Sequence, residues 1–201
     1  MTNRQMQAIA TKQKILDVAE RLISERDFEL VSVDDIVNEC GVAKGTFYHY
    51  FKSKDDILVY IIRSPYEHLR RQHEETEALP WLERLRLFLE NWFRMVDQFN
   101  LSFSRQTFKL YTSPEMMGSY GGDVSHMDLG MELVRECISG AIASGELRKD
   151  TPLDTLTKEM MFSMQGCTLY QCKHAEEFDV MQWCNEFKKL VFGALLKEYI
   201  V

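Results

Sequence analysis

The chain has 201 residues, of which 45% are apolar and 27% charged, and a formal net charge of −7 at pH 7. This length and apolar share suffice for a sizeable core in one large domain or two small ones. No run of about 18 apolar residues occurs, which excludes a predicted membrane-spanning helix. Residues 1–10 are too polar for a signal peptide. We therefore expect a cytoplasmic protein with no membrane partner, and its acidity alone does not indicate nucleic-acid binding.

Helical periodicity dominates the chain, and no alternating apolar–polar run predicts a strand. Ser32 and Asp35 form a predicted capping box before a short helix, and Gly41 suits the end of that helix because positive φ costs glycine little. Pro65 is expected to kink the fourth helix. In chain order, the predicted helices span 6–26, 33–40, 44–51, 54–77, 82–99, 101–112, 123–144, 152–174 and 179–199.

The second and third predicted helices, joined by the turn at Gly41, have the arrangement of a helix-turn-helix. Such a unit delivers its second helix into the major groove of DNA. On a helical wheel, one side of that helix collects Phe47, Tyr50 and Phe51, and the other collects Gly45, Tyr48 and His49. The aromatic side is expected to anchor the helix, and the other side to approach a duplex. A packing unit without a DNA role remains the alternative at this point.

Two basic segments flank this unit. Residues 1–14 contain Arg4, Lys12 and Lys14 without an acid, and residues 44–54 contain three lysines without an acid. Such segments are suited to contact phosphates.

Residues 42–58, which read VAKGTFYHYFKSKDDIL, resemble the DNA-binding signature of the TetR family of bacterial regulators. Residues 15–22 and 33–37 resemble the first two helices of that family. The resemblance covers about residues 10–58 and implies an all-α fold of about nine helices. It implies a three-helix DNA-binding domain at 1–53 and a helical effector-binding and dimerisation domain at 54–201. It also implies a homodimer on a palindromic DNA operator, most often a repressor released by a small-molecule effector.

Carried over by position, the resemblance assigns the DNA contacts. Ala43 departs from the family pattern, because many relatives have a capping serine or threonine there, a cap worth about 1 kcal/mol. Ser32 and Lys54 are expected to hold phosphates, and Lys12 to add another. The expected contacts of the recognition helix are Lys44, Gly45, Thr46, Tyr48 and His49.

The last two predicted helices have apolar stripes at spacings of three and four. Gly166 and Gly193 lie inside these stripes, where glycine costs about 1 kcal/mol relative to alanine. A closely packed partner helix would explain both glycines. Together with the family resemblance, this predicts a homodimer interface that contains Leu156, Met160, Cys167, Trp183, Phe187, Leu190, Val191 and Ala194.

Aromatic residues and methionines are concentrated between residues 88 and 131. A cavity lined by such side chains suits an apolar or amphipathic small molecule, although any one of them could simply fill the core. The candidate effector-pocket residues are Trp92, Phe93, Phe103, Phe108, Tyr111, Met127, Gln165 and Tyr170. The identity of the effector, the operator sequence and the choice between repressor and activator are not predicted.

Other function classes have little support. The chain has no Gly-x-Ser-x-Gly, phosphate-loop or His-Glu-x-x-His motif, so we expect no enzyme. Cys167 and Cys172 are five apart, and on a helix their side chains diverge by about 140°; we therefore expect no metal and no cofactor. Five cysteines without an export signal are expected to be reduced thiols. A regulator switched by cysteine oxidation or by a metal remains the alternative to an organic effector.

Overall fold

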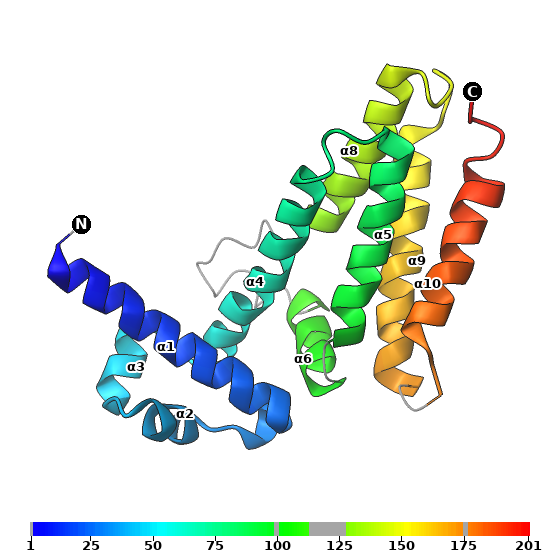
Figure 1. Ribbon diagram of the computed structural model, residues 1–201. Helices are drawn as coiled ribbons and strands as arrows, with labels where there is room; N and C mark the ends of the chain where they lie inside the picture. Colours follow the sequence, from blue (N-terminus) through cyan, green and yellow to red (C-terminus); the bar gives the residue numbers. More distant parts are fainter. Residues whose placement is uncertain (1, 99–100, 113–127, 175–176) are drawn as a thin grey trace. The chain divides into compact units, whose positions relative to one another are not determined.

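The computed structural model describes residues 2–98, 101–112, 128–174 and 177–201. Its regular elements are nine α-helices with short 3₁₀ and π-helical turns (Figure 1), which confirms the all-α prediction. No helix of this part is long and apolar enough to cross a membrane. The chain divides into two compact units. The first contains the chain up to Ser64 and the part of helix α6 (Leu101–Thr112) that begins at Arg105, and the second contains the other described residues.

The first unit contains α1 (Asn3–Glu25), α2 (Val33–Cys40) and α3 (Lys44–Tyr50). Helix α1 begins three residues before the predicted start, because Thr2 and Gln5 form a reciprocal capping box. The predicted box at Ser32 is present at the start of α2, and Gly41 ends that helix with a φ of 66°. Capping signals in the sequence therefore predicted where α2 begins and ends.

Helix α4 (Lys54–Glu74) contains Pro65, and the two compact units divide between Ser64 and Pro65. The first half of α4 packs within the first unit, where the Tyr60 ring lies 5.4 Å from the Phe51 ring. The compact unit thus ends in the middle of α4 rather than at the predicted boundary after residue 53. The first unit extends into α4 because the apolar face of this helix buries Ile57, Leu58 and Ile62.

The second unit contains α5 (Trp81–Gln98), α8 (Leu129–Ser144), α9 (Leu153–His174) and α10 (Val180–Leu190). In this unit α5 packs against α8 and α10, and α8 packs against α9 (Figure 1). Helix α6 (Leu101–Thr112) contributes residues to both units.

Two predicted helices of the second unit differ from the structure. The predicted helix 123–144 begins at Leu129 in the described chain, and its earlier residues up to 127 lie outside the described part. The predicted helix 179–199 changes after Leu190 into a π-helical turn, Val191–Leu195, closed by a bond from Leu196 N–H to Val191 O. The chain end then pairs with the α8–α9 connection, where Arg148 N–H donates to Tyr199 O.

Helices α5 and α8 approach closely at two glycines of α8. A Cβ on Gly140 would overlap the ring of Trp81, and a Cβ on Gly130 would lie 2.7 Å from the ring of Trp92. Both indoles are thus seated directly against the α8 backbone.

We expect Gly140→Ala to destabilise the protein by about 1–3 kcal/mol, because the added methyl must displace a packed indole. Ser139→Ala is the matched control, since Ser139 is exposed on the same helix. The free energy of unfolding from urea titration measures both changes. Equal stability of Gly140→Ala and wild type would contradict the close approach.

Candidate functional site

Helix α3 separates its side chains into a buried face and an exposed face. Phe47 and Phe51 are fully buried, with ring centroids 5.5 Å apart. Gly45, Tyr48 and His49 are exposed on the opposite side, as predicted. Ala43 precedes the helix without a side-chain cap, so the burial of the two phenylalanines has to hold this short helix.

The exposed face is open and aromatic. No atom within 4 Å would meet a Cβ on Gly45, so a duplex could approach the backbone there. The Tyr48 side chain is 51% exposed and rests its ring edge-on against Phe47 at 5.3 Å. His49 lies edge-on against Tyr50 at 4.9 Å. Thr46 is half-buried beside them, at the edge of this face.

Lys44 opens α3 and forms an ion pair with Asp34 of α2, with Nζ 2.8 Å from a carboxylate oxygen. The hydrogen bond to Asp34 raises the pKa of Lys44 above its ordinary value. Both side chains are more than half exposed, so the pair is weak and water can screen it. Lys44 therefore remains able to exchange Asp34 for a phosphate.

The other predicted phosphate contacts also serve the fold. The Nζ of Lys54 donates to Phe28 O at 2.6 Å and lies 4.1 Å from the Phe28 ring centroid. The Nζ of Lys12 lies 3.9 Å from the Tyr60 ring centroid. Ser32 exchanges hydrogen bonds with Asp35 in the capping box. Sequence reasoning predicted the capping box but missed the packing roles of Lys54 and Lys12, because their partners Phe28 and Tyr60 are 26 and 48 residues away in the chain.

Lys52 was not among the predicted contacts, although the acid-free segment 44–54 contains it. Its side chain is exposed between α3 and α4, and its backbone N–H donates to the buried Asp56 at 2.9 Å. The position of Lys52 is therefore fixed at the backbone while its ammonium faces solvent. This makes it a further candidate for a phosphate contact.

Comparison with known proteins agrees with this geometry. Residues 15–61 match the family model of bacterial regulatory proteins of the tetR family. This match assigns the N-terminal part of the chain to the TetR family. This family consists of regulators rather than enzymes, in agreement with the expectation from the absent catalytic motifs.

The curated relatives match this chain in its N-terminal part. The regulator UidR of Escherichia coli strain K12 is 33% identical over 84 residues, which are 41% of this chain and 43% of that protein. YwcC, an uncharacterized HTH-type regulator of Bacillus subtilis strain 168, is 32% identical over 81 residues, or 40% and 34%. The alignments thus span well under half the length of these two relatives.

Solved structures match over almost the whole chain, at low identity. FadR from Bacillus subtilis, solved in complex with stearoyl-CoA, has a TM-score of 0.69 and 19% identity over 90% of this chain and 97% of that chain. SmeT, the repressor of a multidrug efflux pump of Stenotrophomonas maltophilia, has a TM-score of 0.70 and 18% identity over 94% and 90%. These likenesses establish the shared fold.

The predicted effector-pocket residues do not all come together. Trp92 and Phe93 are buried in the second unit, where Trp92 packs on Tyr66 and Phe93 packs on Trp183. Gln165 and Tyr170 are instead exposed on α9 and point away from that core. Phe108 belongs to the first unit. The side chains of Phe103 and Tyr111, and all of Met127, lie outside the described part.

Five buried polar side-chain atoms of the second unit lack a hydrogen-bond partner in the described part of the chain, and two of them belong to the neighbouring side chains of His73 and Arg84. The other three are candidates for a pocket. They are Nε1 of Trp92, Oγ of Ser104 and Oε1 of Gln171. A buried polar group without a partner costs about 1–3 kcal/mol. Such atoms commonly meet a water or a ligand, which makes them better pocket candidates than the two exposed residues of α9. The sequence could not identify these atoms, because only the three-dimensional structure shows whether a buried polar atom has a hydrogen-bond partner.

Most residues of the predicted dimer interface lie on the inward face of α9 and α10. Five of its eight residues are buried within their own chain and offer no surface to a partner: Leu156, Met160, Cys167, Phe187 and Val191. Trp183 is half-buried, and only Leu190 and Ala194 are exposed. Both helices are apolar on two sides, so periodicity could not tell the inward stripe from the outward one.

The outward stripe of α9 and α10 is also apolar. It carries Phe162, Leu169 and Tyr170 on α9, exposed at 60%, 44% and 51%, and Leu190 on α10, exposed at 52%. Cβ atoms on Gly166 or Gly193 would meet nothing within 4 Å. The two glycines therefore face outward, and no described residue of the chain packs against them.

All five cysteines are buried, and none of them forms a disulfide within the described part of the chain. Burial raises the pKa of Cys137 and that of Cys167 to about 12, so these thiols stay protonated and weakly nucleophilic at neutral pH. The described residues contain no group of three metal-ligating side chains. Buried, protonated thiols of this kind are poor candidates for a switch by cysteine oxidation.

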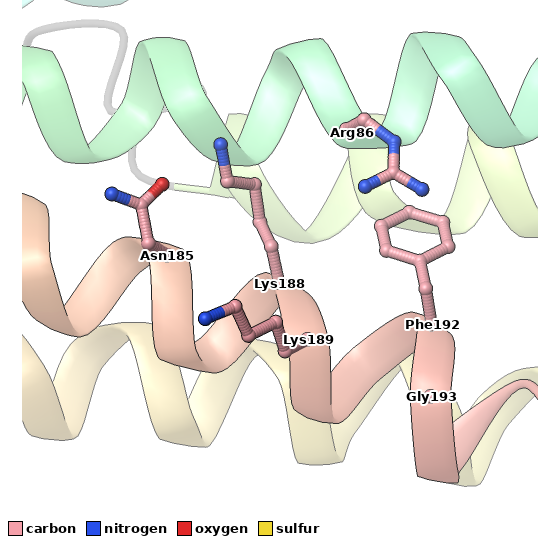
Figure 2. Close-up of a pocket in the computed structure, with 6 residues that line it drawn as sticks. All are labelled: Arg86, Asn185, Lys188, Lys189, Phe192 and Gly193. Atoms are coloured by element: carbon pink, nitrogen blue, oxygen red, sulfur yellow. The ribbon is translucent and has the colours of Figure 1, made fainter.

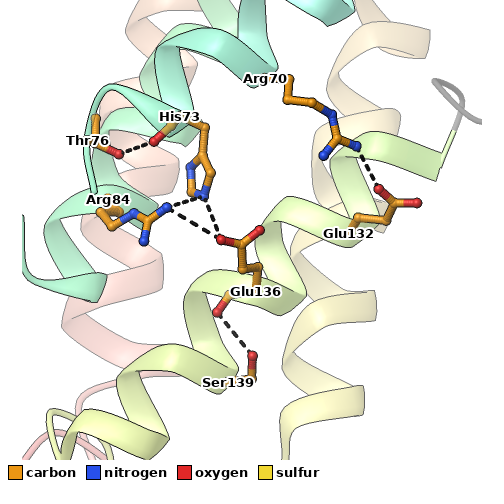
Figure 3. Close-up of polar contacts among 7 residues, drawn as sticks. All are labelled: Arg70, His73, Thr76, Arg84, Glu132, Glu136 and Ser139. Carbon is orange, nitrogen blue, oxygen red and sulfur yellow. Dashed lines mark hydrogen bonds and ion pairs between the residues drawn. The ribbon is translucent and has the colours of Figure 1, made fainter. Parts of the chain in front are cut away.

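A buried polar cluster joins α4, α5 and α8 (Figure 3). His73 Nε2 lies 2.9 Å from an Arg84 nitrogen, and Glu136 of α8 lies 3.4 Å from the same nitrogen. His73 and Arg84 are buried, whereas Glu136 is half-exposed. Because guanidinium only donates, His73 must accept through Nε2 and is neutral. Burial, followed by the nearby Arg84 charge, lowers the pKa of His73 below its ordinary value.

This cluster predicts a pH dependence of stability. The unfolded chain takes up a proton on His73 near pH 6.5, whereas the folded chain resists it, so the free energy of unfolding falls as the pH drops through that value. His73→Gln keeps an acceptor for Arg84 without titrating. Urea titrations at about pH 7.5 and about pH 5.5 should therefore give a flatter dependence for His73→Gln than for wild type. His68→Gln, at an exposed histidine of α4, is the control and should keep the wild-type slope. An unchanged slope in His73→Gln would contradict the neutral, buried histidine.

Proposed function

We propose that the chain is a sequence-specific DNA-binding transcriptional regulator of the TetR type. It acts as a homodimer on a palindromic operator, as a repressor that a small-molecule effector releases. The observation that carries this proposal is helix α3, which buries Phe47 and Phe51 and turns Gly45, Tyr48 and His49 outward. This division of faces is what a helix needs to enter a major groove while staying attached to its domain.

The contacts divide by chemistry. His49 and Thr46 can donate to base edges or phosphates, and the Tyr48 hydroxyl can donate to a phosphate. Cations around α3 supply sequence-independent attraction: Lys44 after release from Asp34, the exposed Lys52, and the remaining donors of Lys12 and Lys54. Ser32 donates both its hydroxyl and its backbone N–H to Asp35, so it would have to leave that carboxylate to contact a phosphate. The acidic remainder of the chain limits binding to this one surface, because like charges repel the duplex elsewhere.

The outward stripe of α9 and α10 is the proposed dimer interface. Phe162, Leu169 and Leu190 leave apolar surface in water that a second copy of the same stripe would cover. Gly166 would let the α9 helices of two protomers approach closely. A self-complementary patch of this kind produces a two-fold dimer, which in turn explains a palindromic operator.

The effector site is proposed in the core of the second unit, near the Trp92 indole. The unpartnered Nε1 of Trp92 and Oε1 of Gln171 would serve an acceptor and a donor of a largely apolar ligand. Two fold neighbours support ligand control: FadR was solved with stearoyl-CoA, and SmeT is a repressor of an efflux pump. The ligand would bind the DNA-incompetent state more tightly, with α4 as the connecting element, since the unit boundary falls at Pro65.

We expect the double change Tyr48→Ala and His49→Ala to abolish preference for a selected operator over random duplex. Each lost contact should cost about 1–3 kcal/mol of discrimination. Lys52→Gln should weaken binding to both duplexes alike and flatten the salt dependence. Fluorescence anisotropy at several salt concentrations measures these effects, with Lys149→Gln, at an exposed lysine of the second unit, as the control. Retained preference in the double variant would contradict the reading face, provided that circular dichroism shows an intact fold.

We expect Leu190→Glu to convert the dimer into folded monomer at micromolar concentration, because a charge would be buried at the interface. Analytical ultracentrifugation measures the mass. Leu79→Glu is the matched control, since Leu79 is also exposed but lies in the α4–α5 connection. Wild-type protein that sediments as a monomer would contradict the dimer.

A further inference from the structure

A second feature of the effector domain has no part in the function proposed above. An open groove of about 790 Å³ lies between α5 and α10 (Figure 2). This volume falls in the range of small-molecule sites. Its lining consists of Arg86, Asn185, Lys188, Lys189, Phe192 and Gly193. None of these residues belongs to the core around Trp92 or to the DNA-reading face.

The groove is positively charged in a chain whose net charge is −7. Lys188 is unusual for a lysine, because its side chain is only 13% exposed. Its Nζ is held 3.0 Å from Glu90, and Glu90 also accepts from Arg94 at 2.6 Å. Hydrogen bonds from Arg94 and Lys188 lower the pKa of Glu90 below its ordinary value. The single negative charge of Glu90 thus faces two cations, Lys188 and Arg94, so the charge around the groove remains positive.

A second cation of the groove is exposed, and no ion pair to it is present among the described residues. Lys189 follows Lys188 on α10 and faces solvent at the groove wall. The Asn185 amide lies one turn earlier on the same helix (Figure 2). An ammonium held in place, a free ammonium and an amide donor on one wall form a set of donors suited to phosphoryl oxygens.

The opposite end of the groove presents flat surfaces. The Arg86 guanidinium of α5 stacks over the Phe192 ring, 4.2 Å from its centroid (Figure 2). Phe192 and Gly193 lie in the π-helical turn Val191–Leu195, and such turns are frequent at functional sites. No atom would meet a Cβ on Gly193 within 4 Å, so there is free space beside the ring. Guanidinium and aromatic planes are both surfaces on which a planar heterocycle stacks.

We propose that this groove binds a phosphorylated small molecule of the nucleotide class. Its phosphoryl groups contact Lys188, Lys189 and Asn185, and its planar ring stacks on the surface made by Arg86 and Phe192. The site is separate from the effector site near Trp92, so the protein has two places for small molecules in one domain. Each could change the affinity for the other through helix α5, which contributes a residue to both sites.

The test uses the full-length protein, with ADP as the probe, pyrophosphate as the ring-free probe and adenosine as the phosphate-free probe. Isothermal titration calorimetry should detect ADP binding, with pyrophosphate at least about tenfold weaker and adenosine weaker still. Lys189→Gln should weaken ADP binding about tenfold, the loss expected for one charge-assisted hydrogen bond. Phe192→Leu should weaken ADP but leave pyrophosphate unchanged, because it removes only the stacking surface.

Two controls separate this site from other anion sites. Lys149→Gln removes an exposed lysine from the α8–α9 connection, and Lys44→Gln removes one from the DNA-reading unit; both should bind ADP as wild type does. The proposal is overturned if ADP does not bind, or if Lys189→Gln binds it as tightly as wild type. Equal affinity for pyrophosphate and ADP would overturn the nucleotide class.

Discussion

The burial of Phe47 and Phe51 is the interaction on which the DNA-reading unit depends. Helix α3 has seven residues and no side-chain cap at Ala43, and an isolated helix of that length is unstable in water. Each buried phenylalanine contributes about 1.5–3 kcal/mol, enough to form the helix only when it is docked. Docking then decides the rest, because the fixed helical spacing turns Tyr48 and His49 to the outside whenever Phe47 and Phe51 face the core.

The same unit uses part of its positive charge for structure. Lys12 of α1 lies over the Tyr60 ring of α4, and Lys54 of α4 is bound to the Phe28 carbonyl in the 3₁₀ turn that follows α1. The ammonium of Lys52 faces solvent, and Lys44 is held only by an exposed ion pair. A low number of accessible cations fits the proposed dimer, in which two copies of a few contacts would replace a broad basic surface.

Local sequence signals predicted the helices and the two faces of α3, because capping residues and apolar spacing act over three or four positions. They failed where the deciding partner is distant in the chain. The partners of Lys12 and Lys54 are examples. So are Nε1 of Trp92 and Oε1 of Gln171, which lack a hydrogen-bond partner in the described part of the chain. The prediction of which face of α9 and α10 is buried failed for another reason. These helices are apolar on two sides, and the pattern could not show that Cys167 and Val191 face inward while Phe162 and Leu190 face outward.

The central claim is that the exposed face of α3 reads DNA sequence in two symmetric copies. Selection of binding sites from a pool of random duplexes at low salt tests it most directly. The structure predicts enrichment of a palindrome made of two half-sites, spaced by about one helical turn or a multiple of it. A pool that shows no enriched sequence after repeated rounds, from protein with an intact fold, would contradict the claim.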